Sequence, residues 1–211
     1  MTSILKADEI QDSSGNLIIK EVSNAITIGA SGDTITIPAG ATIANSGTAS
    51  GFGGITEADQ WRLTSAFTGN VAPIASNLER NDTQFSVIGT GMSESSGVFT
   101  FPSTGIYLIR FYHMFQFKDG NGLAREAKIM HTTNNSSYTA IGLLNRNGLD
   151  EGYDIRSIEA ILDVTDTSNI KVRFDVTGAS TNDRTTGDST LNETCMTFIR
   201  LGDTWYIIII I

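Results

Sequence analysis

Residues 106–117 read IYLIRFYHMFQF, and this stretch decides the fold. Side chains alternate across a β-strand, so every second residue lies on the same face. One face would carry Tyr107, Ile109, Phe111, His113, Phe115 and Phe117, and the other Ile106, Leu108, Arg110, Tyr112, Met114 and Gln116. A sheet with one face in water shows polar residues on that face, whereas both faces here are largely apolar or aromatic. The pattern predicts a strand covered on both faces, with a second subunit as one of the covers.

The sequence around this stretch is also typical of short strands. Runs such as GVFTFP (97–102), EAKIMHT (126–132) and NIKVRFDVTG (169–178) are rich in β-branched and aromatic residues, and separators such as PSTG and TNNSS favour turns. The 211 residues include 21 glycines and 3 prolines, and 18% are charged, where about 25% is usual. Residues 55–211 are therefore expected to form one all-β domain, a sandwich or jelly roll.

Upstream of that domain, residues 26–43 read ITIGASGDTITIPAGATI. Three threonines are each flanked by apolar residues, and glycines separate the three triplets. Short strands of this kind are marginal alone in water, so the isoleucines need a partner surface. We expect residues 17–54 to form a β-rich stem and Gly-rich linker, preceded by an attachment arm at residues 1–16. Three copies of the stem would bury these isoleucines along a shared axis.

The segment GVFTFPSTGIYLIRFYHMF (97–115) resembles the central strands of the complement globular-head and tumour-necrosis-factor-like jelly roll. That family carries a Gly-x-Phe-x-x-Pro-x-x-Gly-x-Tyr pattern, whose places are taken here by Gly97, Phe99, Pro102, Gly105 and Tyr107. The segment STLNETCMTFIRL (189–201) is similar to the family's last strand, but without the glycine usual there. The resemblance covers roughly residues 70–205. It implies a ten-stranded antiparallel jelly roll that assembles as a homotrimer and binds ligands between subunits or at the apex loops.

The predicted fold class is therefore all-β: a short repetitive β stem followed by a ten-stranded antiparallel jelly roll, in a homotrimer. The jelly-roll head would span residues 55–211. Its subunit interface would use the aromatic face of residues 106–117 and the isoleucines of the last residues. The expected trimer-interface residues are Ile26, Ile28, Ile35, Ile37, Ile43, Tyr107, Ile109, Phe111, His113, Phe115 and Ile209.

A second resemblance concerns biology. ITIGASGDTITIPAGATIANSGTASGF (26–52) together with IGTGMSESSGVFTFPSTGIYLIRF (88–111) is similar to structural appendage proteins of marine tailed bacteriophages. It implies a virion structural protein, with a tail-fibre adhesin that contacts a host surface glycan or protein as the leading expectation. The N-terminal arm would bind another virion protein. A head fibre or capsid decoration protein and a small polysaccharide depolymerase are the alternatives.

The sequence shows no Gly-x-Ser-x-Gly elbow, zinc-ligand cluster or phosphate loop, so we expect no cofactor, no metal and no enzyme. His113 lies in an aromatic strand, which favours a hydrogen-bonded core or interface histidine. Cys195 is expected to be a small buried hydrophobe. Candidate ligand residues lie in the loops: Asp150, Glu151, Tyr153, Asp154, Asp183 and Asp188. Their carboxylates have three interpretations, namely solvated turn residues, a cation site or a glycosidase pair, and the first is favoured.

The formal net charge is −9. Such a chain repels phosphate backbones, so we expect no nucleic-acid partner. The first residues, MTSILKADEIQ, show no apolar signal segment, and the run WYIIIII is far shorter than the roughly 20 residues that a spanning helix needs. We therefore expect no membrane insertion. The resemblance to bacteriophage appendage proteins implies a location in the virion.

Overall fold

The computed structural model describes residues 9–23, 25–43, 54–118, 125–146 and 151–204. The chain divides into two compact units, Met1–Phe52 and Gly53–Ile211, each of which is described by itself. Antiparallel strands make up the regular structure of both units, and the described residues contain no helix. The all-β prediction is therefore confirmed.

The first unit is a small three-stranded antiparallel sheet of β1 (Glu9–Gln11), β2 (Leu17–Val22) and β3 (Ala25–Ile28). A tight turn joins β1 to β2, because the Asp12 carboxylate accepts hydrogen bonds from the amides of Ser14 and Asn16. The predicted border between an arm and a stem at residues 16 and 17 falls inside this sheet, since β1 pairs with β2.

Only the first Thr-centred triplet of the stem is a strand. Ile26 to Ile28 belongs to β3, whereas residues 35–37 and 41–43 lie outside regular structure. Neither triplet pairs with a strand in the part of the chain that the structure describes. A turn at Pro38, whose carbonyl accepts a hydrogen bond from the amide of Ala41, separates them. β-propensity alone does not form a strand without a ladder partner, so the repetitive β stem is corrected to one three-stranded sheet followed by an irregular segment.

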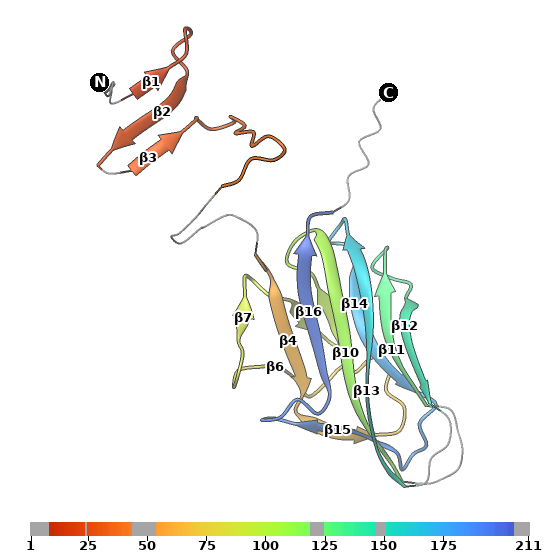
Figure 1. Cartoon of the computed structure of the whole chain (residues 1–211). Helices are drawn as coiled ribbons and strands as arrows, with labels where there is room; N and C mark the ends of the chain where they lie inside the picture. Colours follow the sequence, from red (N-terminus) through yellow and green to blue (C-terminus); the bar gives the residue numbers. More distant parts are fainter. Residues whose placement is uncertain (1–8, 24, 44–53, 119–124, 147–150, 205–211) are drawn as a thin grey trace. The chain divides into compact units, whose positions relative to one another are not determined.

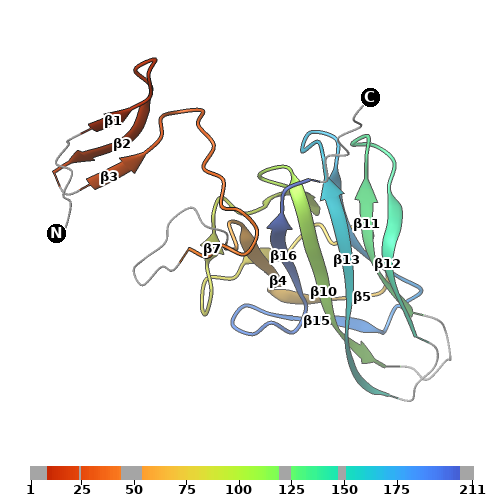
Figure 2. The same ribbon diagram turned by 45° about the horizontal axis from the view of Figure 1, so that its top comes forward.

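The second unit is a sandwich of two antiparallel sheets (Figures 1 and 2). The larger sheet, sheet B, contains β4 (Ala58–Leu63), β5 (Ser65–Thr68), β6 (Leu78–Arg80), β7 (Val87–Ile88), β10 (Gly105–Phe117), β13 (Gly152–Val164), β15 (Arg184–Asp188) and β16 (Cys195–Gly202). The smaller sheet, sheet C, contains β8 (Ser93–Ser95), β9 (Val98–Thr100), β11 (Arg125–Thr132), β12 (Thr139–Arg146) and β14 (Lys171–Thr177). A count of ten strands is not confirmed.

Residues 106–117 belong to β10, which together with β13 is the longest strand of sheet B. On one side β10 pairs with β13 along its whole length, from Gly105 opposite Val164 to Phe117 opposite Gly152. On the other side it pairs first with β16 and then, near its end, with β15. β10 therefore runs the length of the sandwich. We call the end at which β4 begins and β16 ends the entry end, and the end at which β10 ends and β13 begins the loop end.

The core lies between the two sheets. From β10 it receives Tyr107, Ile109, Phe111, Phe115 and Phe117, all almost fully buried in the single chain. They face sheet C directly: the rings of Phe111 and Phe174 lie 5.0 Å apart, and Phe174 also packs edge-on against Phe99. Stacked sheets cover one another's inner faces in this way.

This packing corrects the predicted subunit interface. Tyr107, Ile109, Phe111, His113 and Phe115 are buried by sheet C of the same chain, so they belong to the core of one protomer. The sequence pattern correctly indicated that this face of the strand is covered, but the cover is not another subunit. The opposite face of β10 is the half-exposed one.

Two glycines of the family pattern have a structural reason. Gly97 has a φ of 82°, and a Cβ there would lie 2.5 Å from the carbonyl oxygen of Ile74. Gly105 has a φ of 151°, and a Cβ there would lie 2.5 Å from the side chain of Arg200. Only glycine fits both the backbone conformation and the space at these positions. They let β9 and β10 start against neighbouring segments without a clash.

Candidate subunit interface and ligand-binding end

The outward face of sheet B carries apolar side chains that are half-buried or exposed. β10 and β13 build it together, because residues directly opposite in an antiparallel pair share a face. The pairs are Ile106 with Asp163, Leu108 with Ile161, Arg110 with Glu159, Tyr112 with Ser157, Met114 with Ile155, and Gln116 with Tyr153. β16 extends the face with Thr197, Ile199 and Leu201.

Large apolar side chains on this face are open to solvent. Ile161 is 68% exposed, Tyr153 58% and Leu201 55%. Single exposed apolar residues are ordinary on protein surfaces, but a contiguous patch of them marks an interaction site. The face is therefore the best candidate for a subunit interface in the second unit.

A polar belt divides the outward face into two apolar halves. Arg110 and Glu159 form an ion pair with 2.5 Å between nitrogen and oxygen. Next to it, the Gln60 side chain donates a hydrogen bond of 3.0 Å to the Thr197 hydroxyl. Interfaces commonly combine apolar contact with a few such groups, which fix the register of the partner.

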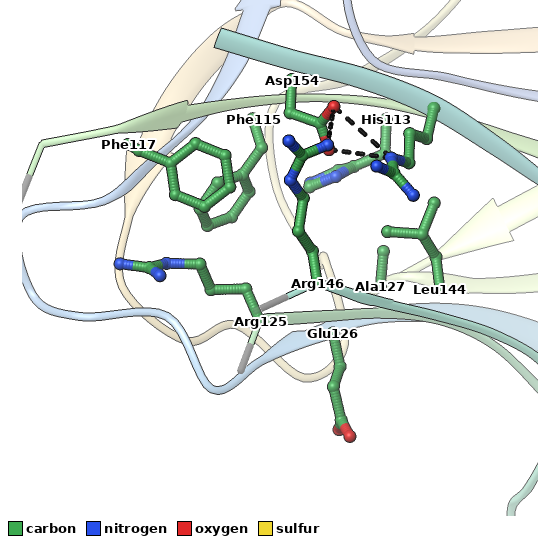
Figure 3. Close-up of a pocket in the computed structure, with 10 residues that line it drawn as sticks. His113, Phe115, Phe117, Arg125, Glu126, Ala127, Leu144, Arg146 and Asp154 are labelled. Carbon is green, nitrogen blue, oxygen red and sulfur yellow. Dashed lines mark hydrogen bonds and ion pairs between the residues drawn. The ribbon is translucent and has the colours of Figure 1, made fainter. Parts of the chain in front are cut away.

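The loop end carries a cluster of arginines around one carboxylate (Figure 3). Arg146 at the end of β12 forms an ion pair with Asp154 at the start of β13, and so joins sheet C to sheet B. Arg156 also reaches Asp154, at 3.1 Å, while about half of its side chain stays exposed. Two guanidinium groups therefore share one carboxylate.

A second ion pair at the loop end is buried. Arg125 bonds Asp183 at 2.5 Å, and both side chains are almost fully buried. Burial on its own raises the pKa of Asp183, but the hydrogen bonds from Arg125 and from the amides of Lys118 and Ser180 outweigh it, so the pKa lies below its ordinary value. Arg125 also lies over the ring of Phe117, 4.7 Å from its centroid. This pair fixes the segment before β15 onto β11.

Between the two arginine groups lies a cavity of about 10 Å³, which is the space of one water-sized sphere. His113, Phe115, Phe117, Ala127 and Leu144 supply most of its apolar wall, whereas the Glu126 side chain points away from the other side chains in Figure 3. His113 itself contacts Thr185, with 3.1 Å between Nε2 and the hydroxyl oxygen. Burial lowers the pKa of His113 to about 4, although the nearby Asp154 acts to raise it.

The predicted ligand residues have diverse places. Glu151 is exposed at the loop end, and Tyr153 accepts a hydrogen bond of 2.8 Å from Gln116 on the outward face. Asp183 is buried, and Asp188 accepts hydrogen bonds from the amides of Thr190 and Leu191, so both serve the structure. Asp150, like the predicted interface residue Ile209, lies outside the described residues. The structure thus gathers Glu151 and Asp154 at one end, whereas Asp183 is buried and Asp188 lies partly exposed in its own turn.

The five stem isoleucines, by contrast, are all exposed in the first unit: Ile26, Ile28, Ile35, Ile37 and Ile43. Sequence reasoning missed the outward-face residues of β13 and the three arginines of the loop end. The alternation in GYDIRSIEAILDV (152–164) was the available signal for the former. No local pattern marks the arginines, because their carboxylate partners come from other strands.

In the described part of the chain, no group of three or more His, Cys, Asp and Glu side chains could hold a metal ion. The same residues contain no helix long and apolar enough to cross a membrane.

No family model matches the chain, and no curated protein matches it in sequence. Two crystal structures of murine APRIL, at pH 8.5 and pH 5.0, are similar in structure. Their sequence identities are 10% and 12%, their TM-scores 0.50 and 0.51, and each alignment covers 69% of this chain and 98% of the other. Identity at this level shows the fold and does not bear on a bacteriophage origin. The second unit has the tumour-necrosis-factor-like jelly-roll fold.

Proposed function

We propose that the chain is a trimeric virion structural protein of a tailed bacteriophage, and that it acts as a tail-fibre adhesin. The observation that carries this proposal is the outward face of sheet B, which presents exposed apolar side chains such as Ile155 and Ile161. A binding protein whose copies associate through this face accounts for its exposed apolar residues without a catalytic role for them.

In the proposed trimer, the outward face of one protomer packs against neighbouring copies around a three-fold axis. Ile155, Ile161 and Leu201, each about half exposed or more, would be the main buried side chains. At about 25 cal/mol per Å² of apolar area, burying a residue of this size contributes about 1.5–3 kcal/mol. The Arg110–Glu159 belt would set the register, because it must meet complementary groups.

The two ends of the sandwich suit different tasks. The chain enters β4 at the entry end, so the arm and the first unit connect there, and the N-terminal arm would bind another virion protein. The loop end is the opposite end of β10 (Figure 1). Its polar cluster of Arg146, Asp154 and Arg156, with the exposed Glu151 nearby, would contact a host surface glycan or protein.

Binding by three copies would be multivalent, so weak single contacts would gain avidity. A depolymerase receives no support from the loop-end carboxylates, because Asp154 and Asp183 are each engaged by arginine. The competing proposal is that the chain is a head fibre or capsid decoration protein of the same particle.

The test is competition for host adsorption. Purified full chain is mixed with the phage and the bacterium on which it grows, and unadsorbed phage is counted. We expect the chain to reduce adsorption. We expect Arg156→Ala to weaken this competition and Lys171→Ala, which removes one cation outside the loop end, to leave it unchanged. In parallel, phage particles are labelled with an antibody against the chain. If the antibody labels capsids rather than tails, and the chain does not compete for adsorption, the protein is a capsid decoration protein and not an adhesin.

A further inference from the structure

The first unit contains a row of three isoleucines across its sheet. Ile10 lies opposite Ile19, and Ile19 lies opposite Ile28, so the three side chains share one face and touch across the ladder. We call them the isoleucine row. The neighbouring row, Glu9, Lys20 and Thr27, lies on the other face and is polar. Its Glu9–Lys20 ion pair spans 3.6 Å. The isoleucine row is therefore an exposed apolar stripe on one face, and the other face combines this polar row with the exposed Ile18 and Val22.

No described residue covers the isoleucine row. Ile10, Ile19 and Ile28 are 38%, 37% and 56% exposed, and Ile26 beside them is 71% exposed. Among residues 9–23 and 25–43, none belongs to the buried core. A sheet of three short strands needs a packed hydrophobic face to be stable in water. The sheet is consequently incomplete as a single copy.

The chemistry of the adjoining segment favours a second copy of this chain as the cover. Residues 25–43 contain one charged side chain, Asp33, and no lysine or arginine. The Asp33 carboxylate is used locally, since it accepts a hydrogen bond of 2.7 Å from the amide of Ala30. Ile35, Ile37 and Ile43 are exposed along the same segment. Copies of this segment can therefore pack together without bringing several like charges into contact, although the whole chain carries a net charge of −9.

We propose that the isoleucine row packs against the same row of other copies, so that the first unit folds only on association and forms an assembly module separate from the outward face of sheet B. The inference rests on the proposed function only for the number of copies. It corrects the predicted stem interface by adding Ile10 and Ile19 to Ile26 and Ile28. The two units would then hold the assembly together independently.

The experiment uses full-length chain in four forms: unaltered, Ile19→Asp, Thr27→Asp and Ile161→Asp. Thr27→Asp is the matched control, because it adds the same charge to the polar face, beside Lys20. Each form is digested briefly with a protease that cleaves at apolar residues, and cleavage within residues 1–52 is timed. Sedimentation gives the number of copies. Cleavage of a site that must open first reports the population of the open state.

We expect the unaltered chain and Thr27→Asp to resist cleavage in the first unit, and Ile19→Asp to be cleaved at least about tenfold faster while still assembled through the second unit. Ile161→Asp should stay associated through the first unit. The inference is overturned if the unaltered chain assembles but its first unit is cleaved as fast as that of Ile19→Asp. The isoleucine row would then be a binding surface for another virion protein. A monomeric unaltered chain would instead remove the proposed homotrimer, so the two failures are distinct.

Discussion

The structure predicts that His113 makes the protein sensitive to acid. This histidine is buried between the rings of Phe111 and Phe115 and faces the Thr185 hydroxyl. The charged residues that line the cavity with it are three arginines and two carboxylates: Arg125, Arg146, Arg156, Glu126 and Asp154. Burial outweighs the attraction of Asp154 and lowers the pKa of His113 from 6.5 to about 4. The folded state therefore prefers the neutral imidazole.

The sign and the size follow from linkage. Above the unfolded pKa of 6.5, His113 is neutral in both states and its titration does not change stability. As the pH falls below 6.5, the unfolded state binds the proton and the folded state does not, so the free energy of unfolding decreases until the pH reaches about 4. The full effect is about 3 kcal/mol, and the part between about pH 7 and about pH 5 is about 2 kcal/mol.

The assay is urea unfolding of the full chain at equal protein concentration, at about pH 7 and about pH 5. Other carboxylates also begin to titrate in this range, so the difference between the protein and His113→Phe isolates the histidine. We expect the unaltered protein to lose about 2 kcal/mol more than the variant on acidification. Equal losses in the two proteins would refute the reasoning, because the proton uptake would then come from other groups.

Three further predictions concern the second unit. Asp183→Ala should lower the free energy of unfolding by about 3–5 kcal/mol, since it removes the carboxylate that bonds the buried Arg125, and thermal or urea unfolding measures this. Gly105→Ala should lower the free energy of unfolding by about 1–3 kcal/mol, because the φ of Gly105 is 151° and the new Cβ would meet Arg200 and the carbonyl of Gly202. An unchanged free energy of unfolding would contradict this close approach. Cys195 should react with a thiol reagent only as fast as the protein unfolds, because it is buried and burial raises the pKa of its thiol to about 11. Rapid labelling of the folded protein would show that the thiol is accessible.

Residues 106–117 show how far the sequence alone could lead. Their alternation correctly predicted a long strand and its two sets of side chains, because the pleat determines which residues share a face. It could not tell which set is the core, since Leu108 and Met114 are as apolar as their neighbours. That choice depends on Phe99 and Phe174, which reach β10 from a separate sheet. A local pattern carries no information about such distant partners.

The loop end was less predictable for the same reason. Asp183 looked like an open loop carboxylate, but Arg125, 58 positions earlier, buries it. Asp154 looked similar and is held by Arg146 from the other sheet. In the first unit, the triplets at 35–37 and 41–43 have the composition of strands but lack a ladder partner. Ion pairs and ladders between distant segments are set by topology, which the triplets and the loop composition do not specify.

The central claim is that copies of the chain associate through the outward face of sheet B. Its most direct test is the mass in solution of the full chain and of Ile161→Asp, with Thr165→Asp on the exposed connection after β13 as the control, measured by sedimentation at micromolar concentration. The account predicts three copies for the unaltered chain and the control, and weakened or incomplete association for Ile161→Asp. A stable, soluble monomer of the unaltered chain, or an Ile161→Asp variant that assembles as tightly as the control, would contradict it.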